Sequence, residues 1–119
     1  MPNPYGVPDI SVQDVARKRT NGETFILLDV REAHELNFAD LGDDVLLAPI
    51  SEIARRYADA LPEEITADKN VEIVVFCHHG SRSAQVASFL LQNGWTNVLN
   101  MEGGINAYAN EVDSSVGQY

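Results

Sequence analysis

The 119-residue chain contains one cysteine, no long apolar run and few basic residues. A single cysteine cannot form an internal disulfide, which agrees with a reducing compartment. The apolar runs fall far short of the roughly 18 residues that a membrane-spanning helix needs. The opening residues, MPNPYGVPD, also lack the basic and apolar regions of a secretory signal. These absences predict a cytoplasmic protein that does not enter a membrane.

The shortage of basic residues limits the kinds of partner that the surface suits. Eight lysines and arginines stand against eighteen aspartates and glutamates, which gives a formal net charge of −10, and none of the eight follows Arg82. This balance argues against binding to nucleic acid or to an anionic membrane. An acidic surface keeps a small protein soluble, and docking to a basic partner is a second interpretation that the sequence leaves open.

Composition and length predict one globular domain over residues 1–119. Apolar residues make up 45% of the chain and charged residues 22%, as is usual for globular proteins. The chain is long enough to bury a core without disulfides, and it shows neither an internal repeat nor a long linker. The ends, near 1–8 and 113–119, are expected to be flexible, unless their proline and tyrosine side chains dock on the body.

Short apolar runs alternate with segments that are typical of helices. The predicted strands cover residues 24–30, 44–49, 71–76 and 96–101. The predicted helices are a segment from Ser11, its cap, to near Asn21, a short one at 31–36, one at 51–61 capped by Ser51 and stopped by Pro62, one at 83–94 ending at Gly94, and one at 105–112 after Gly103-Gly104. We therefore predict an α/β fold, with a doubly wound, open parallel sheet of about five short strands and helices on both faces.

Some individual side chains have expected places in this fold. Ile53, Tyr57 and Leu61 share one face of the helix predicted over 51–61. His34 is expected to be exposed or to cap a helix. Trp95 is expected to pack against the body rather than to bind a substrate.

Cys77 directly follows the strand predicted over 71–76, and ligand sites of open parallel sheets form at such strand ends. His-His-Gly-Ser-Arg-Ser and a predicted helix follow it. In a strand–loop–helix turn of this kind, backbone N–H groups and a helix N-terminus point at the centre of the loop and stabilise an anion. Gly80 allows the backbone to curl, and Arg82 offers a planar fork of donors. The arrangement favours the thiolate of Cys77 over the thiol.

Other interpretations of this loop must be weighed. A free cysteine is usually buried and inert, but the glycine, arginine and two serines that follow Cys77 favour a reactive thiol. For His78 and His79, contact with a substrate and simple exposure in the loop are both open. We expect no metal site, because adjacent histidines in a tight loop point apart and cannot readily share a metal with the cysteine.

The length of the loop separates two chemistries that place a cysteine in an anion cradle. Cysteine-dependent phosphatases resemble a pattern with one residue more between the cysteine and the arginine. Here four residues separate Cys77 from Arg82, and Ser83 stands at the place of that arginine. The shorter loop favours sulfur transfer over attack on a phosphoryl group.

Three motifs resemble the rhodanese-like domains, which are single-domain sulfurtransferases. CHHGSRS is similar to their Cys-x-x-Gly-x-Arg-Ser loop, and LLDVREAHEL is similar to their first signature, a buried strand that runs into Asp-Val-Arg-Glu. LLQNGWTNVLNMEGGINAY is similar to the ending of the family, with Gly-Gly before the last helix. Together these motifs cover nearly the whole chain in the right order.

The resemblance implies a doubly wound α/β fold and a two-step reaction without a cofactor. Cys77 would take sulfane sulfur from a donor such as thiosulfate and pass it from a persulfide to a thiophilic acceptor. The residues implied to contact the small anionic donor are His78, His79, Gly80, Ser81, Arg82 and Ser83. The resemblance also implies that Asp29 and Arg31 brace the loop. Without the resemblance, the two residues would be interpreted as a surface ion pair or as a cap for the short helix that follows them.

One segment departs from the common family pattern. Many members carry Gly-His-Ile-x-Gly-Ala after the first signature, whereas this chain has ADLGDDVLLAPISEI, which resembles the rhodanese domains attached to sulfur-carrier-activating enzymes. The acceptor could be cyanide or a thiol such as glutathione or thioredoxin. The alternative is a relay module that receives persulfide from a cysteine desulfurase and serves a sulfur-carrier system. A cysteine-dependent phosphatase or arsenate reductase is the third hypothesis.

Overall fold

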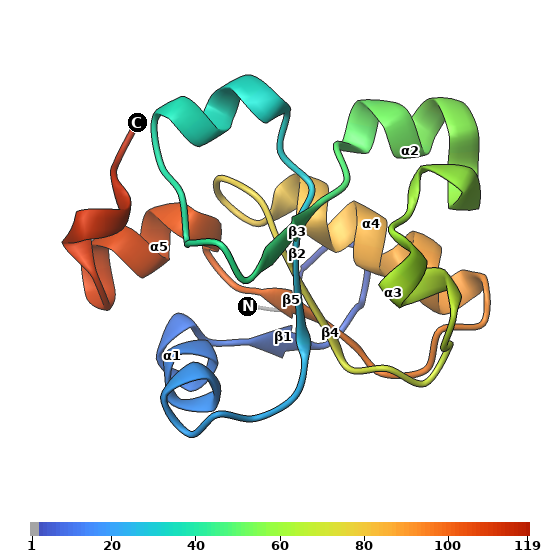
Figure 1. Ribbon diagram of the computed structural model, residues 1–119, viewed down its shortest axis with the longest axis horizontal. Helices are drawn as coiled ribbons and strands as arrows, with labels where there is room; N and C mark the ends of the chain where they lie inside the picture. The colour runs from blue at the N-terminus through green and yellow to red at the C-terminus, as the bar shows by residue number, and fades with distance from the viewer. Residues whose placement is uncertain (1–2) are drawn as a thin grey trace.

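A computed structural model describes residues 3–119, and a five-stranded parallel sheet lies at its centre (Figure 1). The strands lie in the spatial order β1-β5-β4-β2-β3. Their bounds are β1 Asp9–Ile10, β2 Ile26–Asp29, β3 Val45–Leu47, β4 Ile73–Phe76 and β5 Val98–Met101. Every pair of neighbours is parallel. The predicted fold class is confirmed, and the central strand is β4, which leads into Cys77.

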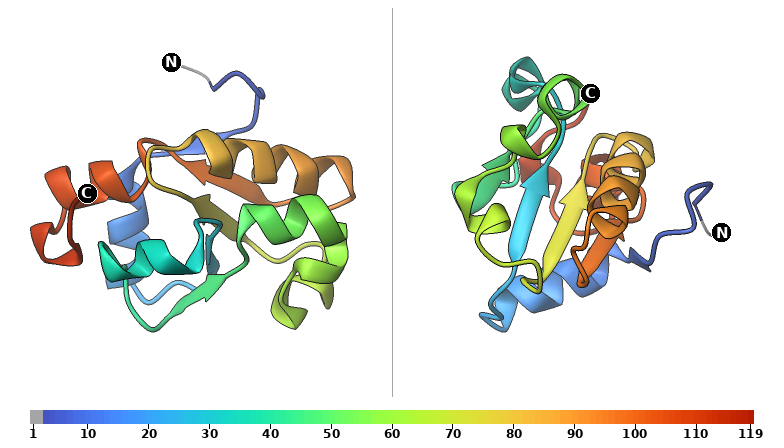
Figure 2. Two further views of the ribbon diagram at one scale, coloured as in Figure 1. Left: turned by 90° about the horizontal axis from the view of Figure 1, so that it is seen from above. Right: turned by 90° about the vertical axis from the view of Figure 1, so that its right-hand side faces the viewer.

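Helices cover both faces of this sheet (Figures 1 and 2). The α-helices are α1 Val12–Thr20, α2 Ile50–Arg56, α3 Glu63–Thr66, α4 Ser81–Gln92 and α5 Gly104–Glu111. The 3-10 helices are η1 Ala33–Asn37, η2 Tyr57–Ala60 and η3 Ser114–Val116. Helices α1 and α5 pack on one face, and α2, α3 and α4 pack on the other. No helix in residues 3–119 is long and apolar enough to cross a membrane.

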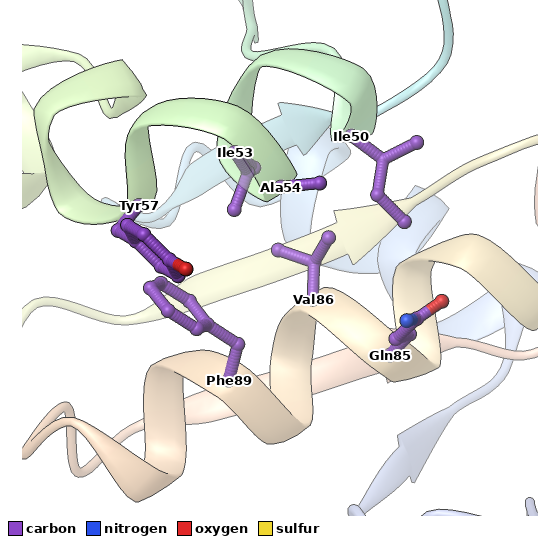
Figure 3. A pocket seen from close by; sticks show the side chains of 7 residues that line it. All are labelled: Ile50, Ile53, Ala54, Tyr57, Gln85, Val86 and Phe89. Carbon is purple, nitrogen blue, oxygen red and sulfur yellow. The ribbon is translucent and has the colours of Figure 1, made fainter.

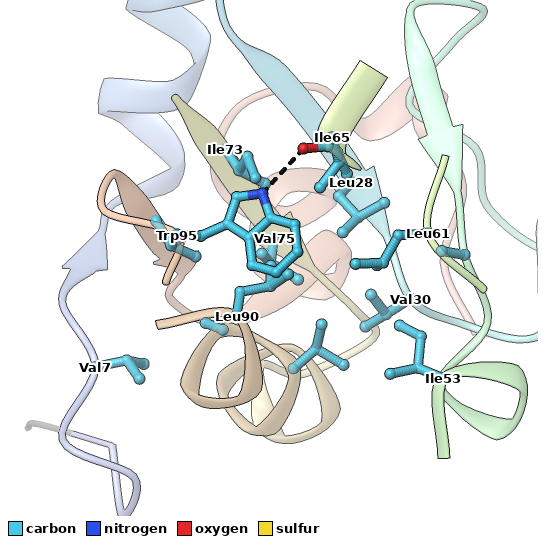
Figure 4. Close-up of a cluster of buried hydrophobic side chains, with 14 of the residues drawn as sticks. Val7, Leu28, Val30, Ile53, Leu61, Ile65, Ile73, Val75, Leu90 and Trp95 are labelled. Atoms are coloured by element: carbon cyan, nitrogen blue, oxygen red, sulfur yellow. Dashed lines mark hydrogen bonds between the residues drawn. The ribbon is translucent and has the colours of Figure 1, made fainter. Parts of the chain in front are cut away.

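Two apolar clusters fill the space between the sheet and the helices because side chains along a strand alternate between its faces. Val75 and Cys77 point toward α4, whereas Val74 and Phe76 point toward α1 and α5. In the cluster under α2, α3 and α4, the Trp95 indole N–H donates to the Ile65 carbonyl at 3.0 Å (Figure 4). The prediction that Trp95 packs in the body is confirmed.

The first residues of α1 and α2 show whether Ser11 and Ser51 cap these helices as predicted. The Ser11 hydroxyl accepts a hydrogen bond from the Asp14 amide at 3.1 Å, so Ser11 caps α1 as predicted. The Ser51 prediction is wrong, because α2 already begins at Ile50, behind Pro49. The Ile50 amide donates to the Val30 carbonyl, which ties the helix start to the end of β2.

The helix predicted over 51–61 is also interrupted. It ends at Arg56, because Tyr57 adopts a left-handed φ of 55°, and a 3-10 turn follows. The prediction of one helical face is therefore wrong, because Tyr57 lies beyond the end of the helix and is 67% exposed, while Ile53 and Leu61 are buried. Pro62 does stop that segment, but it also caps α3, a helix that the sequence did not predict.

The described parts of both chain ends contact the body. Val7 is buried in the cluster under α4, although the first two residues lie outside the described part. Tyr119 contacts the side chains of Arg31 and Glu35. Val7 and Tyr119 thus lie against the body, and the flexibility of the ends stays a prediction.

Candidate active site

The carboxyl ends of β2, β4 and β5 bring three distant segments to one edge of the sheet. The strand register pairs Asp29 with Phe76 and Asn100 with Val75. Cys77 follows Phe76 directly, so the segments after β2 and β5 flank it from both sides. The prediction that the cysteine lies at the carboxyl edge is confirmed, in agreement with the general position of sites in open parallel sheets.

The Cys77 sulfur lies inside a backbone cradle. Cys77 is only 1% exposed, and the Gly80 amide donates a hydrogen bond to its Sγ at 3.1 Å. The Ser83 hydroxyl lies 3.4 Å from the same sulfur. Gly80 has a φ of 109°, a conformation that costs a residue with a side chain considerably more, and it stands at the N-terminus of α4. The cradle thus directs donors and a helix N-terminus at the thiol.

A buried polar chain extends from Ser83 away from the sulfur. Its hydroxyl lies 2.5 Å from Asn100 Oδ1, and the Asn100 amide nitrogen donates to Asp9 Oδ1 at 3.0 Å. Asn100 is buried, so these bonds satisfy groups that would otherwise be costly to bury. The Ser83 hydroxyl has a single proton, which can serve either Asn100 or the sulfur.

The N-terminus of helix α5 binds the loop that follows Cys77. The Ile105 and Asn106 amides, which lie in the first turn of α5, donate to the carbonyls of Cys77 and His78 at 2.9 and 3.0 Å. Such first-turn amides have no partner within their own helix. A Cβ on Gly104 would lie 2.6 Å from the Cys77 carbonyl oxygen, so only glycine allows this approach. The second glycine of the Gly-Gly motif is therefore a docking point for the active loop.

Arg82 points at a carboxylate rather than at the sulfur. Its two terminal nitrogens donate to Glu35 Oε2 and Oε1 at 2.6 and 2.9 Å, as a bidentate pair. The resemblance implied that Arg82 contacts an anionic donor; in this structure both of its terminal nitrogens donate to Glu35. Glu35 lies in η1, after β2, and the sequence had not marked it as a site residue.

The Glu35 carboxylate collects four donors. Besides Arg82, it accepts the Glu32 amide at 2.8 Å and the Tyr119 hydroxyl at 2.9 Å. The Arg82 guanidinium, with help from these two groups, lowers the pKa of Glu35 from its ordinary 4.5 to about 2, although burial opposes the shift. Pairing with Glu35 raises the pKa of Arg82. The pair therefore remains ionised at any ordinary working pH.

Asp29 and Arg31 form a second pair, which is completely buried. Arg31 donates to both Asp29 oxygens, and it also reaches the Ala39 carbonyl at 2.9 Å and the Tyr119 hydroxyl at 3.0 Å. Interpretation of the two residues as a surface ion pair is thus excluded. Arg31 binds the carbonyls of Glu35 and Ala39 and so fixes the segment that carries Glu35; the support of the loop that the resemblance implied stays a prediction.

The two histidines of the loop have different surroundings. His78 is half-buried and stacks on Tyr119, with ring centroids 3.8 Å apart and an angle of 4° between the planes. Burial, together with the neighbouring His79, lowers the pKa of His78 below its ordinary 6.5. His79 and Ser81 are exposed, and so is His34 in η1, as predicted. In residues 3–119, no three His, Cys, Asp or Glu side chains are grouped closely enough to hold a metal ion.

Two hollows lie near these elements. One is polar and borders the loop itself at His79, Gly80 and Ser81; its other lining residues are Asn3, Pro4, Asp9, Asn100, Glu102 and Gly103. The other is an apolar groove between α2 and α4, where Ile53 and Tyr57 face Val86 and Phe89 (Figure 3). No residue of the Cys77 loop lines the apolar groove, so the polar hollow is the one that adjoins the cradle.

Four residues of this site were missed from the sequence. Glu35 could have been found as the third residue of a capping box with Glu32. Asp9 lies in β1, whose two residues give no recognisable strand pattern. Asn100 stands among apolar neighbours in β5, where a polar residue is unusual, and that contrast was its only signal. Tyr119 lies far along the chain from every motif.

Comparisons with known proteins agree with this geometry. The model of the family described as rhodanese-like domain matches residues 11–111. A sulfurtransferase from Allochromatium vinosum is 32% identical over 87% of this chain and 89% of its own length. The crystal structure of a rhodanese-related protein from Thermoplasma volcanium is 31% identical, with a TM-score of 0.71, and the match covers 88% of this chain and 93% of that one.

The name of a longer relative joins two activities. The protein named adenylyltransferase and sulfurtransferase UBA4, from Debaryomyces hansenii, is 32% identical over 92% of this chain. The chain spans only 25% of the length of that relative. The similarity therefore concerns one part of that protein.

Proposed function

Because the chain belongs to the rhodanese-like domain family of sulfurtransferases, we propose that Cys77 carries sulfane sulfur as a persulfide. The donor would be a small sulfur compound such as thiosulfate, and the acceptor a thiol or cyanide. The observation that supports this proposal most directly is the Gly80 amide on the Cys77 sulfur, at 3.1 Å, in a loop that opens α4. We place this reaction in the cytoplasm.

The proposed reaction has two balanced steps. The Cys77 thiolate attacks the outer sulfur of thiosulfate, the new S–S bond forms, the old S–S bond breaks, and sulfite leaves with the electron pair. Cyanide or a thiolate then attacks the outer sulfur of the Cys77 persulfide. The Cys77 thiolate leaves, and the product is thiocyanate or a new persulfide.

Each part of the cradle has a role in these steps. The negative charge passes from the thiolate to the outer persulfide sulfur, so it stays near the Gly80 amide and the N-terminus of α4. Amide donors and helix N-termini stabilise such a charge. The Ser83 hydroxyl can turn from Asn100 toward the sulfur and donate as the charge develops. In a phosphatase-like loop an arginine would stand at this place, so the buried serine favours sulfur chemistry.

The alternative is a relay module with little turnover of its own. In this role Cys77 would receive sulfur from a cysteine desulfurase and deliver it to a partner such as thioredoxin or a sulfur-carrier system. The supporting observation is the relative whose name joins adenylyltransferase and sulfurtransferase. The net charge of −10 is compatible with a partner that presents a basic surface.

Transfer of labelled sulfur tests the proposal. Thiosulfate labelled at its outer sulfur is mixed with cyanide and either the wild-type protein or Cys77→Ser. We expect labelled thiocyanate from the wild type and a rate lower by about a thousandfold or more from Cys77→Ser. Ser88→Ala, a serine on the same helix outside the cradle, is the matched control and should keep the wild-type rate.

The relay alternative is measured in the same format, with labelled cysteine and a cysteine desulfurase as the source. Rapid labelling of Cys77 from the desulfurase together with slow turnover of thiosulfate would favour the relay. If neither source labels Cys77, both forms of the proposal are wrong.

A further inference from the structure

We infer that the site discriminates between sulfur donors by charge and takes sulfur from low-charge persulfides in preference to dianionic thiosulfate. This inference rests on the proposed function and narrows its substrate class. Its basis is the pairing of Arg82, the one guanidinium of the active loop, with the carboxylate of Glu35.

A count of charges around the cradle supports this. The two arginines at the carboxyl edge of the sheet, Arg31 and Arg82, are each matched by one carboxylate, at 2.8 and 2.6 Å. The other basic residues lie on α1 and α2 or, for Lys69, over the Trp95 ring. The two arginine–carboxylate pairs therefore add no net positive charge that could attract a dianion.

Unpaired acidic groups make the surroundings more negative. The polar hollow beside His79 and Gly80 is lined by Asp9 and Glu102, and no lysine or arginine lines it. At the start of η1, the Glu32 carboxylate accepts the Ser51 hydroxyl at 2.7 Å, an uncharged partner. A donor that approaches Cys77 through this hollow meets the carboxylates of Asp9 and Glu102 before it reaches the Gly80 amide at the sulfur.

Tyr119 holds this charge arrangement in place. Its hydroxyl donates to Glu35 Oε1 at 2.9 Å and accepts from Arg31 at 3.0 Å, so one phenol connects the two pairs. Its ring stacks on His78 and also on Phe38. Tyr119 lies outside residues 11–111, the part that matches the family model. We assign Tyr119 as a positioning residue that keeps Glu35 on Arg82.

A persulfide donor reacts with Cys77 by the same kind of displacement as thiosulfate. The Cys77 thiolate attacks the outer sulfur of R–S–SH, the donor S–S bond breaks, and R–S⁻ leaves, so that Cys77–S–SH forms. The donor carries at most one negative charge on sulfur, whereas thiosulfate brings two. Repulsion by the carboxylates of the hollow therefore penalises thiosulfate more.

The test measures the rate of Cys77 persulfidation in single turnover, by timed quenching and intact-mass analysis. The donors are thiosulfate and the persulfide of mercaptoethanol, which has an uncharged carbon skeleton. Comparing the ratio of the two rate constants between proteins cancels the different intrinsic reactivity of the donors. We expect Glu35→Gln to raise the thiosulfate-to-persulfide ratio by about tenfold, because it leaves the Arg82 charge unmatched.

Two controls separate this effect from a general loss of structure. Glu52→Gln removes the same charge from an exposed pair on α2 and should leave the ratio unchanged. Tyr119→Phe should shift the ratio in the direction of Glu35→Gln by about two- to threefold, while Tyr57→Phe should not shift it. Each control is judged by the ratio of the thiosulfate and persulfide rate constants. A simple loss of folded protein does not change this ratio.

The wild type alone gives a further test, which needs no variant. We expect the rate with thiosulfate to rise with ionic strength and the rate with the persulfide to change little, because salt screens repulsion. If the thiosulfate rate falls with salt, or if Glu35→Gln leaves the ratio unchanged while both donors label Cys77, the inference is wrong and the proposed function stands. If neither donor labels Cys77, the proposed function itself is wrong.

Discussion

Two arginine–carboxylate pairs lie at the same edge of the sheet but in different surroundings. In the Asp29–Arg31 pair the side chains are 1% and 0% exposed. Arg31 also donates hydrogen bonds to backbone carbonyls and to the Tyr119 hydroxyl. In the Glu35–Arg82 pair the side chains are 11% and 32% exposed, and Arg82 is part of the active loop. The first pair is shut off from solvent, whereas the second is partly open to it, and we propose that only the second affects which donor reacts at Cys77.

The buried pair should give the larger effect on stability. Arg31→Met leaves Asp29 as a buried charge without its partner, so we expect the free energy of unfolding to fall by about 3–5 kcal/mol. Urea denaturation at neutral pH measures it. Arg55→Met is the matched control, since Arg55 pairs with Glu52 on the exposed surface of α2, and it should cost less than about 1 kcal/mol. Equal losses in the two variants would contradict the contrast.

The second pair should give a smaller effect that depends on pH. The pKa of Glu35 is about 2 in the folded protein, below its ordinary 4.5. A carboxyl group with a lowered folded pKa adds stability above its unfolded pKa, and this contribution is lost as the pH falls toward the folded value. We therefore expect Glu35→Gln to cost about 2 kcal/mol at pH 7, and the gap to the wild type to close between pH 5 and pH 2.

Urea denaturation at a series of pH values measures this gap. Glu52→Gln, which removes a carboxylate from an exposed pair, should show a small gap at every pH. A Glu35→Gln gap that stays constant down to the acid end would show that the charge of Glu35 contributes nothing to stability.

The phenol that connects the two pairs should give the smallest effect. Tyr119→Phe keeps the ring on His78 but removes the hydrogen bonds to Glu35 and Arg31. We expect a loss of about 1 kcal/mol in thermal or urea unfolding. Tyr57→Phe, at an exposed ring, is the control and should change stability by less than about 0.5 kcal/mol. A Tyr119→Phe variant as stable as that control would mean that the two pairs are independent.

The same contrast shows what the sequence could predict. Asp29, Arg31 and the Cys77 loop follow apolar runs, so strand ends and a parallel sheet were enough to place them at one edge. The direction of the Arg82 side chain was not predictable, because it depends on Glu35, which is 47 residues away. Tyr119 is 84 residues from Glu35, and only the packed fold brings them together.

Local signals also failed where tertiary contacts compete with them. Ser51 is a residue type that often caps a helix. Here, however, the Ile50 amide donates a hydrogen bond to the Val30 carbonyl, and the helix already begins at Ile50. Tyr57 fits the helical period of its segment, but its left-handed backbone ends the helix and exposes its ring. Helical periodicity predicts a face only as far as the helix extends.

Intact-mass measurement of the protein under non-reducing conditions is the most direct test of Cys77 as the sulfur carrier. The wild type and Cys77→Ser are each incubated with an excess of thiosulfate or mercaptoethanol persulfide, and then treated with cyanide. We predict a gain of one sulfur atom, about 32 Da, on the wild type alone, and its removal by cyanide. No gain on the wild type with either donor, or an equal gain on Cys77→Ser, would contradict the account.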